Sequence, residues 1–141
     1  MTKPIHTCLW FDGKAKEAAD YYCNVFKNSK LISANPMVVM FEINGMLFMG
    51  LNGGPQFKFN ESVSFVITCK DQAEIDYYWN TLTADGGLES NCGWLKDKYG
   101  LSWQVVPEEL GEIFSNPTNG QRAMQAMLKM NKLDIAILKN A

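Results

Sequence analysis

A short internal repeat constrains the fold of this chain more than any other feature. Residues 20–24 read DYYCN and residues 76–80 read DYYWN. With these pentapeptides in register, LWFDGKAKEAADYYCNVF, which starts at residue 9, aligns with FVITCKDQAEIDYYWNTL, which starts at residue 65. Each copy is a short apolar run, a polar turn and a segment with helical spacing, which predicts a strand followed by a helix whose tyrosines pack against a sheet. The chain therefore contains a duplicated β-α unit.

The repeat continues beyond the two helical segments. Apolar runs at residues 31–33, 37–43 and 46–51 follow the first helix, and Asn44 and Gly45 between the last two are a strong hairpin signal. Runs at residues 88–90, 94–96 and 101–106 follow the second helix, with Gly100 in the turn equivalent to that of Gly45. We therefore predict two β-α-β-β-β modules, at residues 4–54 and 61–107, within one domain of residues 1–141.

Residues 108–141 have no counterpart in the first half, and we expect them to form a C-terminal helical extension. Its predicted apolar helical stripe consists of Ala123, Met124, Met127, Leu128 and Leu133. Upstream, Asp71 with Glu74 three residues later predicts the capped start of the second module's helix.

Composition excludes several classes of protein. The net charge of -2 gives no basic field, so we expect no nucleic-acid partner. No apolar run approaches the roughly 18 residues of a membrane span, and the first residues do not resemble a signal peptide. The 4 cysteines are far apart and form no C-x-x-C pair. We therefore expect free thiols and a cytoplasmic location.

Three stretches resemble one family across nearly the whole chain. CLWFDGKAKEAADYYCNVFKNSK, FEINGMLFMGLNGGPQFKFNESVSFVI and CGWLKDKYGLSWQVVP are similar to the PhnB-like family, whose legacy label is 3-demethylubiquinone-9 3-methyltransferase. This family belongs to the glyoxalase/bleomycin-resistance/dioxygenase superfamily, also called vicinal oxygen chelate. The resemblance implies an α+β fold with two tandem β-α-β-β-β modules that form curved mixed sheets around a cavity, plus C-terminal helices. It also implies a homodimer and, in many members, a divalent metal held by His, Gln or Glu from the first and last strands of each module.

Transferring those metal-ligand positions to this chain gives an unsuitable set. The first-strand positions fall at Cys8 and Ser64, and the last-strand positions, counted from the two turn glycines, fall at Met49 and Gln104. A hard divalent cation prefers carboxylate and imidazole ligands, so only Gln104 is a reasonable member. We therefore expect neither a metal nor another cofactor.

Two further residues could take part in acid–base chemistry. His6, the 1 histidine of the chain, shares strand parity with Cys8 and is either a ligand or general base, or a surface residue at the start of a strand. Glu42 alternates with Phe41 and Ile43, and the sequence leaves open which of the two faces is the core.

Aromatic side chains on or beside the predicted strands suggest an apolar pocket. Asn52 follows the last strand of the first module, and Gly53 and Gly54 after it allow close backbone approach and positive φ, as in either a plain linker or the rim of a pocket. The residues that we predict to contact a ligand are Cys8, Trp10, Phe41, Met49, Asn52, Ser64, Trp94, Trp103 and Gln104.

Three functions follow from these observations. The expected one is binding of a small apolar or aromatic molecule in the cavity between the sheets without a metal, by a PhnB-like protein of undefined activity and with no catalytic residue assigned. The alternative is a metal-dependent lyase, isomerase or dioxygenase of the vicinal oxygen chelate type. The methyltransferase of the legacy label is less favoured, because the chain lacks a glycine-rich turn between a first strand and a helix.

Overall fold

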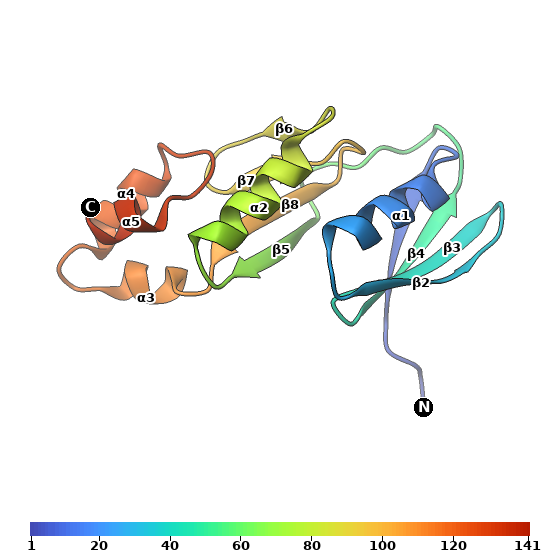
Figure 1. Ribbon diagram of the computed structural model, residues 1–141, viewed down its shortest axis with the longest axis horizontal. Helices are drawn as coiled ribbons and strands as arrows, with labels where there is room; N and C mark the ends of the chain where they lie inside the picture. The colour runs from blue at the N-terminus through green and yellow to red at the C-terminus, as the bar shows by residue number, and fades with distance from the viewer. The chain divides into compact units, whose positions relative to one another are not determined.

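The computed structural model describes residues 1–141, which form two compact units, residues 1–59 and 60–141. The first unit contains β1 (Thr7–Phe11), α1 (Ala15–Val25), β2 (Ser29–Ala34), β3 (Val38–Ile43) and β4 (Met46–Asn52). Its sheet has the order β1-β4-β3-β2, with β1 parallel to β4 and the other pairs antiparallel (Figure 1).

The second unit repeats this topology and adds three helices. It contains β5 (Ser64–Cys69), α2 (Gln72–Thr83), β6 (Leu88–Glu89), β7 (Trp94–Lys96) and β8 (Ser102–Pro107), followed by α3 (Leu110–Ser115), α4 (Gly120–Met127) and α5 (Ile135–Lys139). The sheet order is β5-β8-β7-β6, again with one parallel pair, β5 and β8. The predicted duplication of a β-α-β-β-β module is confirmed, and both sheets are open.

In the first unit, α1 covers one face of the sheet. Tyr22 is fully buried on the sheet side of α1, and its ring stacks on Phe41 with 6.2 Å between centroids. The backbone N–H of Ala15, the first residue of α1, donates to the Asn52 side-chain oxygen at 2.9 Å, whereas Lys14 at the N-cap supplies no side-chain bond. The strand end therefore caps the helix and fixes its start against the sheet.

In the second unit, the helix start follows the predicted pattern. The Asp71 carboxylate accepts from the Glu74 N–H at 2.9 Å, and Glu74 Oε1 accepts from the Lys70 N–H at 2.9 Å. This confirms the predicted cap. The tyrosine prediction is only half right, because Trp79 occupies the buried position of α2 while Tyr78 is half-buried and Tyr77 is exposed.

The C-terminal helices have a small core of their own. Ile113, Ala123, Leu133 and Leu138 are buried together there. The predicted helical stripe was wrong in part: α4 ends at Met127, so Leu133 enters the core from the following loop, while Met124 and Leu128 are exposed.

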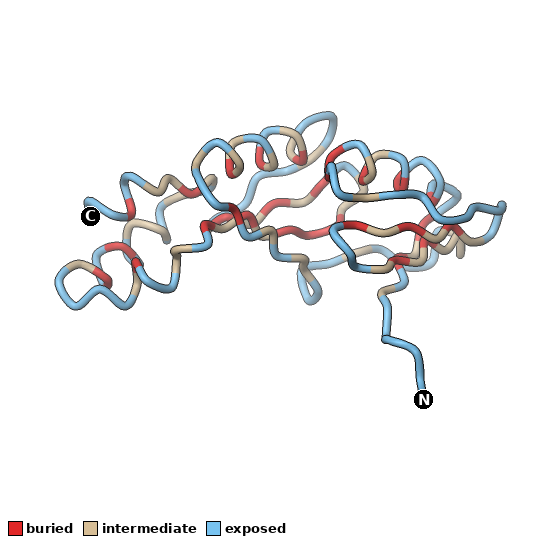
Figure 2. The backbone as a smooth tube through the Cα atoms, turned by 60° about the horizontal axis from the view of Figure 1, so that its bottom comes forward, coloured by how far each residue is buried: buried red, intermediate tan, exposed pale blue.

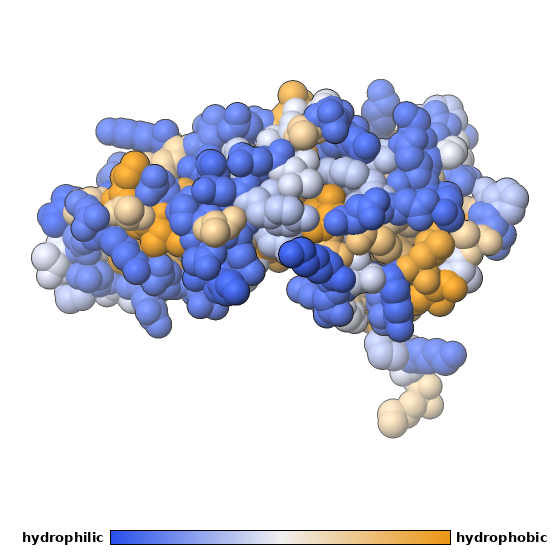
Figure 3. Space-filling view, viewed as in Figure 1, coloured by the Kyte–Doolittle hydropathy of each residue, from blue (hydrophilic) through white to orange (hydrophobic).

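Buried residues follow the strands and the sheet-facing sides of the helices, whereas residues 1–6 form an exposed arm (Figure 2). Apolar side chains reach the surface over the β2–β3 region and over the C-terminal helices (Figure 3), where Leu31, Ile32, Leu128 and Ile137 are exposed. None of the helices is both long enough and apolar enough to span a bilayer.

Candidate functional site

Each sheet has one face that its helix does not cover, which we call its open face. On the first sheet, Leu9, Phe11, Val39, Phe41, Ile43 and Phe48 are buried on the side of α1. Alternation along the strands therefore places the intervening residues on the open face. These are Cys8, Trp10, Val38, Met40, Glu42, Leu47, Met49 and Leu51.

Trp10 is held on this face by the segment that follows β4. Its indole N–H donates to the Gly54 carbonyl at 2.9 Å, and Phe57 packs edge-on at 4.9 Å between ring centroids. A Cβ at Gly53 would lie 2.3 Å from the Trp10 ring, so only glycine fits there. The predicted close backbone approach at Gly53 is therefore confirmed. These contacts hold the Trp10 ring in place on the open face.

Three of the residues that we predicted to contact a ligand are buried under a helix or bonded within the fold instead. Phe41 is 0% exposed between α1 and the first sheet. Trp103 is also buried, on the α2 side of the second sheet, and its indole N–H donates to Asp97 Oδ2 at 2.9 Å. The Asn52 side chain caps Ala15 and donates to the Pro36 carbonyl at 3.0 Å, so both ends of its amide are engaged. We therefore remove Phe41, Trp103 and Asn52 from the candidate site.

The structure also places the two acid–base candidates. Glu42 lies on the open face and forms an ion pair with Lys30 at 3.6 Å. His6 lies in the exposed arm before β1.

On the second sheet, the open face carries a polar pair beside an aromatic ring. The Gln104 side-chain N–H donates to Ser64 Oγ at 3.0 Å. Trp94 on β7 and Val66 on β5 are the Cα partners of Gln104, so the amide lies between two apolar side chains. The Ser102 hydroxyl, two residues before Gln104, is buried and has no hydrogen-bond partner.

A second ion pair borders this polar pair. Lys96, the Cα partner of Ser102, binds the Glu61 carboxylate. The hydrogen bond and the charge of Lys96 lower the pKa of Glu61 below its ordinary value. Lys96 is therefore already neutralised, and this face offers a ligand neutral donors and acceptors.

The two modules differ in register between their first and last strands. Cys8 is the Cα partner of Met49, but Ser64 is the partner of Ser102, and Gln104 is the partner of Val66. Counting from the turn glycines therefore misses a shift of two residues. An even shift keeps side chains on the same face, so Ser64 and Gln104 still meet.

The open faces do not supply the ligands of a hard divalent ion. Their central side chains carry a thiol, thioethers, hydroxyls and an amide, and no group of three or more His, Cys, Asp or Glu residues suited to a metal occurs in the chain. Such ions prefer carboxylate and imidazole ligands, so the residues present do not fit the divalent metal that the sequence resemblance implies.

Asp97 is a buried residue that the sequence analysis did not select. Its carboxylate accepts from the Trp103 indole and from the N–H groups of Tyr99 and Leu101 at 2.9 and 3.1 Å. It thus fixes the β7–β8 turn and the Trp103 ring beneath the candidate site. The pattern Asp97-x-x-Gly100 is typical of such a turn and could have indicated it.

Comparisons with known proteins agree with this architecture. A family model described as 3-demethylubiquinone-9 3-methyltransferase matches residues 3–106. Among solved structures, the PhnB protein from Bacillus cereus, which carries the same methyltransferase label, is 30% identical with a TM-score of 0.67, and the match covers 74% of this chain and 99% of that one. A search of curated proteins found no match.

More distant structures support the fold alone. Protein PA1353 from Pseudomonas aeruginosa is 20% identical with a TM-score of 0.61, covering 76% of this chain and 98% of that one. The fosfomycin resistance protein FosX from Listeria monocytogenes is 15% identical with a TM-score of 0.55, covering 74% and 90%. The family match stops at residue 106, so α3, α4 and α5 lie outside it. The chain therefore belongs to the 3-demethylubiquinone-9 3-methyltransferase-like, PhnB-like family.

Proposed function

We propose that this protein binds a small apolar or aromatic molecule, without a metal ion, on the open face of its second sheet. The observation that carries the proposal is the Ser64–Gln104 pair, which lies beside Trp94 on a face that no helix of the unit covers. Small-molecule sites combine mostly apolar walls with a few placed polar groups, and this face has both.

The polar groups of the face retain unused hydrogen-bonding capacity. Gln104 uses one N–H for Ser64, which leaves its second N–H and its carbonyl oxygen for a ligand. Ser64, having accepted that bond, can still donate its own hydroxyl proton. Ser102 has a buried hydroxyl without a partner, which a polar ligand atom would satisfy. A group that both donates and accepts, such as a phenol, an alcohol or a carboxamide, suits this set.

The apolar groups lie on both sides of the amide. Val66 is 56% exposed and Trp94 is half-buried, so both can contact a ligand. A planar ring placed on Trp94 would bring its polar substituent to Gln104 on the neighbouring strand. Stacking of this kind adds about 0.5–1.5 kcal/mol beyond the burial of area.

The two enzymatic alternatives are less well supported. A metal-dependent lyase, isomerase or dioxygenase needs ligands that the open faces lack. A methyltransferase with a nucleotide fold needs a glycine-rich turn at a helix N-terminus, but the β1–α1 turn contains only Gly13. Stoichiometric binding of Ni²⁺, Mn²⁺ or Zn²⁺ would support the first alternative, and calorimetric binding of S-adenosylmethionine the second.

A ligand panel tests the proposal. Phenols, catechols, quinones and aromatic carboxamides are titrated into EDTA-treated protein, with tryptophan fluorescence and thermal shift as readouts. We expect at least one class to bind, and Gln104→Ala to weaken its binding about 10-fold, as the loss of one hydrogen bond of about 1.4 kcal/mol implies.

Gln125→Ala is the matched control, because Gln125 is exposed on α4. It should leave the binding unchanged. The proposal fails if no compound binds, or if folded Gln104→Ala protein binds the ligand as tightly as the original chain.

A further inference from the structure

Three sulfur-containing side chains form a row across the open face of the first sheet. Cys8 on β1 is the Cα partner of Met49 on β4, and Met49 is in turn the partner of Met40 on β3. Directly opposed residues of an antiparallel pair such as β3 and β4 have Cβ atoms about 4.5–5.5 Å apart. The parallel strands β1 and β4 are neighbours about 4.8 Å apart, so the Cys8 and Met49 side chains are also within reach of one another. The row lies opposite α1, since the flanking residues Phe48 and Phe41 are buried on the helix side.

These side chains are accessible and are not part of the hydrophobic core. Cys8 is exposed, and Met40 and Met49 are half-buried. A thioether has three rotatable bonds, so both methionine sulfur atoms can move toward the Cys8 thiol while the strand ladder keeps their backbones in register. The sheet therefore fixes the backbone positions, while the methionine side chains can adjust their sulfur atoms to a bound ion.

The other functional groups of this face are engaged elsewhere. Glu42 is paired with Lys30, and the Trp10 indole N–H is bonded to the Gly54 carbonyl. The row itself therefore offers only sulfur donors. The donor set that fails for a hard divalent cation suits a soft monovalent one, because thiolate and thioether ligands select Cu(I).

We propose that Cys8, Met49 and Met40 form a binding site for a soft monovalent cation such as Cu(I) or Ag(I). Cys8 supplies the anionic ligand and the two methionines supply neutral thioether ligands. Binding replaces the thiol proton of Cys8 with the metal ion and releases that proton to solvent. No electron is transferred, since the ion enters and remains monovalent. All three ligands belong to the first unit.

The experiment uses reduced full-length protein under anaerobic conditions. Ag(I), which avoids redox chemistry, is titrated with calorimetry and native mass spectrometry, and Cu(I) affinity is measured by competition with bathocuproine disulfonate. We expect a tight site for one ion per chain, with release of about one proton in weakly buffered solution.

Substitutions separate a three-sulfur site from a single reactive thiol. Cys8→Ser should weaken binding about 100-fold, and Met49→Leu and Met40→Leu about 10-fold each, since loss of a ligand removes part of the affinity. Leucine conserves side-chain volume, so both methionine variants should stay folded. The matched controls Cys23→Ser, Cys92→Ser and Met124→Leu should bind as the original chain does.

Methionine-methyl NMR provides a second readout. The Met40 and Met49 methyl signals should shift on addition of Ag(I), whereas that of Met124 should not. The proposal is overturned if folded Met40→Leu and Met49→Leu proteins bind with unchanged affinity, which would show a lone thiol. It is also overturned if Cys8→Ser retains the tight site.

Discussion

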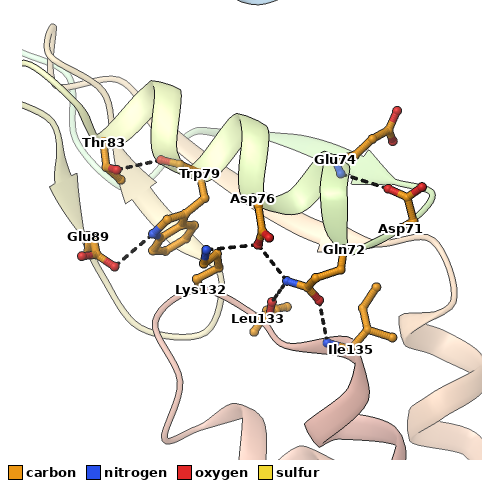
Figure 4. Close-up of polar contacts among 10 residues, drawn as sticks. All are labelled: Asp71, Gln72, Glu74, Asp76, Trp79, Thr83, Glu89, Lys132, Leu133 and Ile135. Carbon is orange, nitrogen blue, oxygen red and sulfur yellow. Dashed lines mark hydrogen bonds and ion pairs between the residues drawn. The ribbon is translucent and has the colours of Figure 1, made fainter.

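Gln72, at the first position of α2, connects the second module to the C-terminal helices, and its replacement by alanine tests how they are held. Its side-chain N–H groups donate to the Leu133 carbonyl and to Asp76 Oδ1, each at 3.0 Å, and its oxygen accepts from the Ile135 N–H at 2.9 Å (Figure 4). Lys132 pairs with the same Asp76 at 3.0 Å. One amide therefore satisfies two backbone groups of the segment that leads into α5.

The expected loss of unfolding free energy follows from the backbone groups that the substitution leaves without partners. In Gln72→Ala, the Leu133 carbonyl and the Ile135 N–H both lose their partner, and each unsatisfied buried group costs about 1–3 kcal/mol. Both contacts are partly buried, so water replaces part of each bond and the lower half of that range applies. We expect a loss of about 2–3 kcal/mol, or roughly 5–10 °C in Tm for a chain of this length.

Urea unfolding and amide hydrogen exchange measure this effect. The midpoint should fall, and the Ile135 amide should lose protection, while Gln125→Ala, an exposed change on α4, should alter neither. Unchanged unfolding together with full protection of Ile135 in Gln72→Ala would refute the reasoning.

The same variant should change the titration of Asp76. The hydrogen bond from Gln72, and then Lys132, lower the pKa of Asp76 below its ordinary value. A lowered pKa in the folded state stabilises the fold above the ordinary carboxyl pKa, and this contribution is lost as the pH falls through the folded value. In Gln72→Ala, the pKa of Asp76 measured by NMR should therefore rise toward its ordinary value. An unchanged pKa would contradict the assigned cause.

Further predictions concern the units themselves. Asp97→Ala removes the acceptor of three hydrogen bonds and should cost about 3–5 kcal/mol in urea unfolding; a loss under about 1 kcal/mol would show that the turn does not depend on it. Gly53→Ala places a Cβ against the Trp10 ring and should cost about 1–3 kcal/mol and change the tryptophan emission, whereas an unperturbed spectrum would contradict the close packing. Burial raises the pKa of Cys69 to about 12, so at pH 8 this thiol should not react with a thiol reagent until the protein unfolds, and prompt labelling of folded protein would contradict its burial. We also propose a homodimer, because edge strand β2 exposes Leu31 and Ile32; light scattering at micromolar concentration should give twice the chain mass, and a monomer would refute this.

Local patterns were sufficient for most of the fold. The repeated pentapeptide, the Asn44-Gly45 turn and the Asp71 cap depend on neighbours within a few residues, and each appears in the structure where it was expected. The prediction for α4 failed because Met124 and Leu128 have helical spacing, yet the helix ends before a loop delivers Leu133 to the core. Periodicity identifies the apolar residues of a helix, but it does not determine where the helix ends or which of these residues pack against another element.

The candidate site was likewise determined in part by local sequence and in part by tertiary packing. Sequence alone determined that two β-α-β-β-β modules exist and that Cys8, Met49, Ser64 and Gln104 lie on the first and last strands of these modules. Only the tertiary structure decided which face of each sheet the helix covers, and this removed Phe41 and Trp103 from the site and placed Met40 beside Met49. The physical reason is that strand alternation defines two equivalent faces. The packing of α1 and α2, which involves residues distant in sequence, makes one of them a core and leaves the other for ligands.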